Sequence, residues 1–219
     1  MQRFTLIHDG SAQGWQAAYL AFHITAQLGA PLLVILTGSV TDHKTILQRA
    51  SQIEVGGRAA GVTIETRLVM DFSLEYLSGN PIDGLFAPKH LVPDGKTAMR
   101  FIKVLSCPVW IVSKEAELHR TALLVDQPAV NQELVREITI LSGRLQQPLT
   151  GLVLQSEFTR IPKTDVTVVW MPLPDFSMRE IHTVLKQLDA TLIFLPASHA
   201  SLVAELSVNC VVWPVLQDA

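Results

Sequence analysis

The sequence has few of the residues that mark a secreted, membrane or metal-binding protein. Only two of its 219 residues are cysteines, Cys107 and Cys210, which excludes a disulfide framework. Neither has a second Cys or a His at metal-ligand spacing, so we interpret both as structural thiols and expect no metal site. No apolar run reaches the ~18 residues that cross a bilayer. The N-terminus MQRFTLIHDG lacks the apolar core of a signal peptide, which predicts a cytoplasmic protein without membrane contact.

Charged residues are also scarce. They make up 17% of the chain, whereas hydrophobic residues make up 48%, which predicts a large apolar core or a buried interface. The formal net charge is −3, and Lys and Arg form no basic stripe, so the composition does not favour nucleic-acid binding. The length allows one large domain or two small ones.

The first half of the chain alternates short apolar runs with helical patterns. Ser11 is a suitable N-cap for a helix that Gly29 would end, because glycine readily adopts the left-handed conformation found there. The run PLLVILTGS (31–39) is continuously apolar, as expected for a buried strand, and the alternation of strands and helices predicts a parallel sheet with helices on both faces. We predict strands within residues 4–8, 31–39, 62–69, 83–90 and 107–112. We predict one helix over 12–28, a second that follows the second strand and ends at about residue 61, and two more over 72–77 and 95–106.

The second half repeats this order. Its last strand, CVVWPV (210–215), closely resembles CPVWIV (107–112), the last strand of the first half. We predict strands within 121–128, 151–156, 166–172, 191–196 and 210–215, and helices over 130–147, 176–189 and 199–207. The second helix is missing, because the segment 156–163 is short and contains Pro162. We interpret the chain as a tandem duplication with domains 1–113 and 120–219. The alternative is that the two halves are unrelated and look alike only because buried parallel strands have similar compositions.

Several stretches resemble the universal stress protein family. The segment DGSAQGWQAAYLAFHITAQLGAPLLVILTG (9–38) is similar to the opening of such a domain, with its Asp-Gly-Ser turn, Ala-rich helix and Leu-Gly-Ala terminus. RAAGVTIETRLV (58–69) resembles the entry to the third strand of the family, and SCPVWIV (106–112) its closing strand. The resemblance covers nearly all of the first half and, more weakly, the second half.

The resemblance implies an α/β fold of two tandem five-stranded parallel sheets, each in the order 3-2-1-4-5 and flanked by helices. Members of the family commonly dimerise through strand five, so the two halves would pair through this strand as a pseudo-dimer. An unpaired apolar edge strand invites aggregation, and the pairing would remove that edge and bury Trp110 and Trp213. Pro214 lacks an N–H group, so it must lie where no ladder hydrogen bond is required.

Nucleotide-binding members carry spaced glycines after strand four, followed by Ser or Thr. Their counterpart here is Gly95 with Lys96 and Thr97, and Asp9-Gly10 ends strand one at the switch point. For Asp9 the alternatives are a nucleotide contact and an Asx-turn. For Gly95 they are an anion seat at a helix start and an ordinary helix start, and we favour the latter. Lys89 and His90 could line the same mouth, although the loop FAPKHLVPD has lost the other glycines.

The second half keeps less of this site. Asp126 is followed by Gln127-Pro128, and PASHASL (196–202) contains no glycine, with Ser198-His199 in the place of Gly95-Lys96. We therefore expect no cofactor, with ATP or AMP admitted as a ligand in the first domain only and bound weakly.

Two functional hypotheses follow. The first is a non-catalytic, stress-type regulatory protein with an unidentified protein partner and, as an alternative assembly, a homodimer. The second is a nucleotide-binding α/β enzyme acting on an adenylated or phosphorylated substrate. No acid–base pair or nucleophile elbow accompanies the glycine loop, so we identify no catalytic residue and favour the first.

Overall fold

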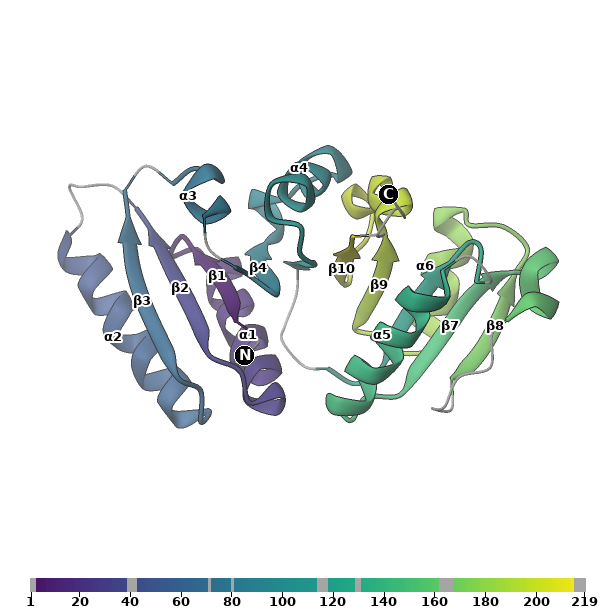
Figure 1. The fold of residues 1–219 in the computed structure, drawn as a ribbon, viewed down its shortest axis with the longest axis horizontal. Coiled ribbons are helices and arrows are strands. Elements are labelled where there is room, and N and C mark those ends of the chain that lie inside the picture. The colour runs from purple at the N-terminus through teal and green to yellow at the C-terminus, as the bar shows by residue number, and fades with distance from the viewer. Residues whose placement is uncertain are drawn as a thin grey trace.

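The computed structural model describes residues 3–38, 43–70, 72–79, 81–113, 118–128, 131–161 and 168–214. Its strands form one ten-stranded sheet in the order β3-β2-β1-β4-β5-β10-β9-β6-β7-β8 (Figure 1). Each half contributes five strands in the order 3-2-1-4-5, and the halves meet at their fifth strands. The predicted fold class, strand order and pairing through strand five are therefore confirmed.

The elements follow the predicted alternation. The first half contains β1 (Phe4–His8), α1 (Ala12–Leu28), β2 (Leu32–Thr37), α2 (His43–Ala59), β3 (Ile64–Val69), α3 (Glu75–Ser78), β4 (Gly84–Pro88), the 3-10 turn η2 (Lys89–Leu91), α4 (Gly95–Leu105) and β5 (Val109–Val112). The second half contains β6 (Thr121–Val125), α5 (Gln132–Arg144), β7 (Leu149–Leu154), η3 (Gln155–Arg160), β8 (Val169–Leu173), α6 (Met178–Gln187), β9 (Leu192–Pro196), η4 (Ala197–Ala204) and β10 (Asn209–Trp213). We refer to residues 3–112 as the first unit and to residues 121–214 as the second; the predicted domain limits themselves stay a prediction.

The helices cover both faces of the sheet, and each face has its own apolar core. Buried side chains of α1, α2 and α5 pack on one face, around Phe86, Trp110 and Phe194. Side chains of α3, α4, α6 and η4 pack on the other, around Ile35, Ile111 and Leu195. Both cores contain residues of both units, so the sheet and its two apolar layers run through the whole molecule. These two cores account for the high share of hydrophobic residues, from which the sequence predicts a large apolar core or a buried interface.

The fifth strands join the units. Among the described strands, β5 and β10 pair antiparallel, with Trp110 opposite Val211 and Val109 opposite Val212, whereas the other paired strands are parallel. Trp110 is 1% exposed. Its ring lies 5.1 Å from that of Phe86 in its own unit and 5.9 Å from that of Phe194 in the other. This tryptophan therefore lies at the centre of the joint between the units.

Trp213 differs from the expectation that both tryptophans are buried. Trp213 and Val211 point to the same face of β10, because they are two residues apart, and Trp110 shares that face as the partner of Val211. Trp110 already fills the centre, so Trp213 is only half-buried and donates a hydrogen bond from Nε1 to Glu137 Oε2 at 2.9 Å. Pro214 follows the end of β10, where it interrupts no described ladder hydrogen bond, as expected.

The second unit is trimmed, as predicted, but in a different form. Where the first unit has α2, the second has the 3-10 segment η3, and where the first has α4, the second has the 3-10 segment η4 in place of the expected α-helix. Pro162 itself lies outside the described residues. The short helix expected over 72–77 begins later, at Glu75.

Candidate functional site

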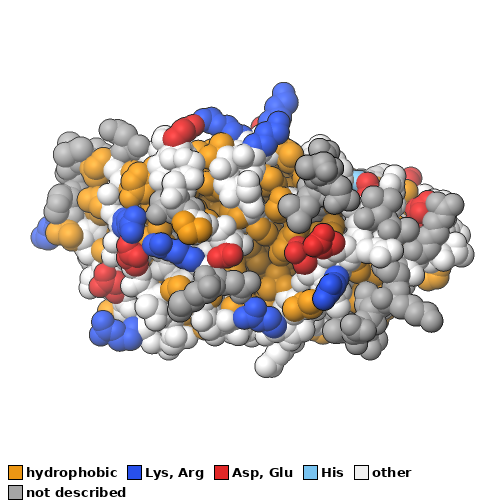
Figure 2. Space-filling model, viewed as in Figure 1, with side chains coloured by type: hydrophobic (Ala, Val, Ile, Leu, Met, Phe, Trp, Pro, Cys, Tyr) orange, Lys and Arg blue, Asp and Glu red, His pale blue; other side chains and the backbone are white. Residues whose placement is uncertain are grey.

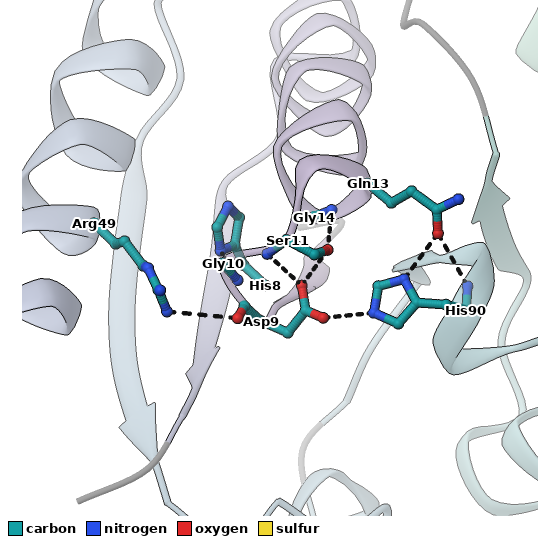
Figure 3. A network of polar contacts seen from close by, with 8 residues as sticks. All are labelled: His8, Asp9, Gly10, Ser11, Gln13, Gly14, Arg49 and His90. Carbon is teal, nitrogen blue, oxygen red and sulfur yellow. Dashed lines mark hydrogen bonds and ion pairs between the residues drawn. The ribbon is translucent and has the colours of Figure 1, made fainter. Parts of the chain in front are cut away.

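Asp9 follows β1, whose neighbours β2 and β4 lie on its two sides, which is the switch point of the first unit. Its Oδ1 atom accepts hydrogen bonds from the backbone N–H of Ser11 at 3.0 Å and from Ser11 Oγ at 2.7 Å. Ser11 Oγ in turn accepts from Gly14 N at 2.9 Å and so caps α1, as its sequence position predicts (Figure 3). One oxygen of Asp9 therefore holds the turn that starts α1.

The other oxygen of Asp9 meets the loop after β4. Asp9 Oδ2 lies 2.5 Å from His90 Nε2. The second ring nitrogen, Nδ1, lies 2.8 Å from Gln13 Oε1, which also accepts from the backbone N–H of His90 at 3.3 Å. A backbone N–H can only donate, so the Gln13 atom must be the oxygen. Both nitrogens of His90 thus lie within hydrogen-bond distance of side-chain oxygens of the chain itself (Figure 3).

This arrangement stabilises the Asp9 carboxylate. Burial raises the pKa of Asp9, but hydrogen bonds from Ser11 and His90 outweigh the burial and hold the pKa below its ordinary value. Arg49 of α2 approaches from the opposite side, with Nη1 at 3.5 Å from the backbone oxygen of Asp9. Gly10 has a φ of +84°, and a Cβ atom there would lie 2.2 Å from Arg49 Cζ. Side chains of the protein itself therefore occupy the surroundings of Asp9.

His8 lies beneath this network and is completely buried. Its Nδ1 accepts from the backbone N–H of Gly10 at 3.1 Å, and its ring packs edge-on against Trp15, with the ring centroids 4.6 Å apart. Burial lowers the pKa of His8 to about 4, although the negative charge of Asp9 acts in the opposite direction. His8 is therefore neutral at physiological pH and belongs to the core.

Gly95 and Lys96 lie elsewhere, at the start of α4. Asp94 is the N-cap of this helix, and its carboxylate accepts from Thr97 N at 2.8 Å. Gly95 is buried against η4 of the second unit, and a Cβ atom on Gly95 would lie 2.4 Å from the backbone oxygen of Ala200. The glycine thus permits a close approach of two backbones. The helix N-terminus already holds an anion, the side chain of Asp94.

The structure therefore separates the predicted site residues into two groups. Asp9 and Gly10 contact Ser11, His90 and Arg49, whereas Gly95 and Lys96 line a cavity between α4 and η4, whose lining does not include Asp9. Lys89 joins neither group, because its Nζ donates to the backbone oxygens of Leu206 at 2.5 Å and Ala204 at 3.4 Å in the second unit.

The second unit has a looser counterpart of the Asp9 network. Asp126 follows β6, and its Oδ2 lies 3.9 Å from Nδ1 of His199 in η4. The ring of His199 packs edge-on against Phe176, with the ring centroids 5.4 Å apart. His199 therefore corresponds in place to His90, since each follows the fourth strand of its unit. This differs from the prediction that Ser198-His199 takes the place of Gly95-Lys96, which rests on counting residues back from Cys210.

Sequence reasoning noted His90 but missed its partners Gln13 and Arg49. Gln13 is the second residue of α1, and Arg49 lies on α2, far from Asp9 in sequence, so only the folded arrangement brings them together with His90. The signal that could have found His90 was the repetition of a His two or three residues after Pro88 and Pro196 in both units.

Metal-holding clusters, membrane-spanning helices and low-pKa thiols are not found in the described ranges of the chain. There, no group of three or more His, Cys, Asp or Glu side chains could hold a metal ion. None of the helices that the structure describes combines the length and hydropathy of a membrane span. Burial raises the pKa of both Cys107 and Cys210 to about 12, so neither thiol is reactive at neutral pH.

Comparison with known proteins adds structural relatives only. No known family model matches the sequence, and no curated protein is significantly similar to it. Among solved structures, a universal stress protein from Archaeoglobus fulgidus DSM 4304 superposes with a TM-score of 0.66 at 13% identity, over 97% of this chain and 96% of that one. A protein assigned to the universal stress proteins from Pseudomonas aeruginosa UCBPP-PA14 gives 0.64 at 12% identity, over 98% and 93%.

A third relative has a different role. The cytoplasmic domain of a prokaryotic cation chloride cotransporter superposes with a TM-score of 0.55 at 12% identity, over 96% of this chain and 94% of that domain. At such identities the likeness concerns the fold. At that level the resemblance predicted from the sequence is confirmed.

Proposed function

We propose that this chain, which has the fold of universal stress proteins in tandem arrangement, is a non-catalytic regulatory protein of the stress response. It acts by binding a protein partner, and its first unit holds at most a weakly bound anion or nucleotide. We place it in the cytoplasm, and we assign it no nucleic-acid ligand and no cofactor.

The observation that carries this proposal is the closed state of the Asp9 carboxylate. Both of its oxygens are engaged within the chain, one by Ser11 and the other by His90, which is itself held by Gln13. A ribose or base that approached Asp9 would have to displace the partly exposed Asp9–His90 pair, which costs up to ~1 kcal/mol, or the hydrogen bonds from Ser11. The site is therefore stable without a ligand.

The phosphate side of a nucleotide site is also poorly supported. Phosphates are usually held by free backbone N–H groups of a glycine-rich loop and the following helix. Here Asp94 caps α4 and Gly95 packs against Ala200. Pro88 and Pro93 further stiffen the loop. Losing two or three such hydrogen bonds weakens binding by several orders of magnitude.

The enzyme hypothesis is the weaker one for the same reasons. A catalytic role would require a general acid or base with access to a substrate, whereas His90 and Asp9 bind each other. Since the cotransporter domain shares the fold, the fold by itself does not determine the partner.

Isothermal titration with ATP and Mg²⁺ tests the proposal. We expect no binding tighter than the millimolar range for the wild-type protein. A micromolar affinity that is abolished by Asp9→Ala, but kept in an Asp126→Ala control, would show that the first unit is a nucleotide site. Hydrolysis of ATP under the same conditions would favour the enzyme.

A further inference from the structure

The trimming of the second unit leaves a cavity between the units, beside α4. The corresponding elements of the two units differ here, because α4 is an α-helix of 11 residues and η4 a 3-10 segment of 8 residues. The two segments touch where Gly95 meets Ala200. Beyond that contact, a cavity of about 900 Å³ opens between them, within the size range of ligand pockets, roughly 300–1,000 Å³.

One wall of the cavity is cationic and apolar, and the other is neutral. Lys96, Arg100 and Lys103 of α4 line it, together with the half-buried side chains of Met99 and Val104. These five positions share one helix face, since they are spaced three or four residues apart along α4. The opposite wall consists of small residues of η4, Ala197, Ala200 and Ser201. Lys and Arg side chains gather over α4 at the upper edge of the molecule in Figure 2.

Few acidic groups neutralise this wall. Asp94 also lines the cavity, but its carboxylate caps α4 through Thr97. Arg100 lies 3.6 Å from Glu75 of α3 in a pair whose two side chains are mostly exposed, so a ligand could exchange with Glu75 readily. Within the described part of the chain, no ion pair joins Lys96 or Lys103. In a chain with a net charge of −3, a local excess of positive charge marks a place for an anionic partner.

The arrangement of the charges indicates the class of partner. Lys96 and Lys103 are seven residues apart, which is about 10 Å along the helix. A single phosphate group spans much less than this and would leave the apolar side chains uncovered. A duplex nucleic acid would present its phosphate backbone, and no apolar group, to Met99 and Val104. An amphipathic segment with Asp or Glu at helical spacing and apolar residues between them matches both features.

We propose that the cavity between α4 and η4 is a docking site for an acidic, amphipathic segment of a partner protein. This inference deepens the regulatory function proposed above and rests on it, because it identifies the chemistry of the protein partner. In this docking site Lys96 binds an acidic side chain of the partner and not a nucleotide. Neither Asp9 nor His90 takes part in the docking site.

A synthetic peptide probe tests this site in the full-length protein. The probe is a fluorescent helical peptide with Glu at the spacing of Lys96, Arg100 and Lys103 and Leu between them. Its matched control carries Gln in place of Glu. We expect the Glu peptide to bind at least about tenfold more tightly than the Gln peptide and to lose affinity as salt is added.

Charge variants locate the binding. The double variant Lys96→Gln and Lys103→Gln should weaken binding of the Glu peptide by about tenfold or more. Its matched control is Lys44→Gln and Lys186→Gln, two exposed lysines of α2 and α6, which should leave binding unchanged. All four lysine side chains are exposed, so we expect both variants to be as stable as the wild type. Equal midpoints of urea unfolding would confirm that both variants fold.

Three results would overturn the proposal. The first is that the Glu and Gln peptides bind equally or that neither binds. The second is that the control variant loses as much affinity for the Glu peptide as the double variant does. The third is that a single-stranded RNA probe binds more tightly than the Glu peptide and depends on the same lysines. The ATP titration depends on Asp9 and not on Lys103, so the two proposals fail separately. Nucleotide binding that is lost in Asp9→Ala would refute the first and leave the peptide result to decide the second.

Discussion

The two units retain the same sheet but differ at the ends of their first and fourth strands. The first strand ends at His8 and is followed by Asp9-Gly10 in the first unit, and it ends at Val125 and is followed by Asp126-Gln127 in the second. His90 lies 2.5 Å from Asp9, whereas His199 lies 3.9 Å from Asp126. A full helix, α4, follows in one unit and a 3-10 segment in the other. The two units therefore share their strand order and their pairing through the fifth strands, whereas the loops and helices around the sheet differ.

The largest effect is expected at the joint of the units. Trp110→Ala should lower the free energy of unfolding by ~3–5 kcal/mol, because it removes a buried aromatic side chain that contacts both units. Trp213→Ala should cost less, since that side chain is half-buried. Urea unfolding measures both, and an unchanged midpoint for Trp110→Ala would show that the joint is not held as described.

The second effect concerns pH and distinguishes the first strands. The pKa of His8 is lowered from 6.5 to about 4 in the folded protein. Above pH 6.5 His8 is neutral in both states; between pH 6.5 and 4 the unfolded chain binds a proton that the folded chain does not. Stability should therefore fall by about 3 kcal/mol as the pH decreases through this window.

A substitution isolates that contribution. His8→Val gives the first unit the residue that the second has at Val125, and it should flatten the pH dependence between pH 6.5 and 4. Denaturant midpoints at several pH values provide the measurement. An unaltered pH profile in the variant would mean that His8 is not the group responsible.

The third effect concerns the close contact of α4 and η4. Gly95→Ala should destabilise the protein by ~1–3 kcal/mol, because the new Cβ would lie 2.4 Å from a backbone oxygen of Ala200 and the segments would have to move apart. Gly143→Ala in α5 is the matched control. It meets no atom within 4 Å and should be neutral or stabilising by up to ~1 kcal/mol. Equal thermal stability of the two variants would argue against the contact.

The smallest effect separates the two Asp–His pairs. His90→Ala should reduce stability by up to ~1 kcal/mol, since the pair is partly exposed, and His199→Ala by less, because its partner is more distant. Thermal unfolding compares the two variants. A greater loss in His199→Ala would reverse the assignment of the tighter pair to the first unit. Nitrogen NMR at neutral pH can show directly whether both ring nitrogens of His90 carry protons.

The strands inside the sheet were predictable because each is a local apolar pattern, whereas β3 at one edge contains Glu65 and Arg67. The strand Phe4–His8 was predicted at its true limits, and the repeated Cys-x-Val-Trp ending indicated the pairing of β5 with β10. The short helices were less predictable, since the choice between an α-helix and a 3-10 segment at Ala197–Ala204 depends on packing against α4.

The candidate site was the least predictable part. Asp9 and Gly95 were selected by position in the family pattern, but their contacts involve residues distant in sequence. Asp9 meets His90, 81 positions away, and Gly95 meets Ala200 of the other unit. A local pattern contains no information on such contacts. It could not reveal that Gly95 serves a packing contact or that His90 binds Asp9.

The central claim is that the first unit is complete without a nucleotide, because its own side chains engage Asp9. The most direct measurement is the nucleotide content of the purified full-length protein, released by denaturation and quantified by chromatography and mass spectrometry. The account predicts ATP and AMP far below one molecule per chain. One equivalent of either nucleotide, lost from the Asp9→Ala variant, would contradict it.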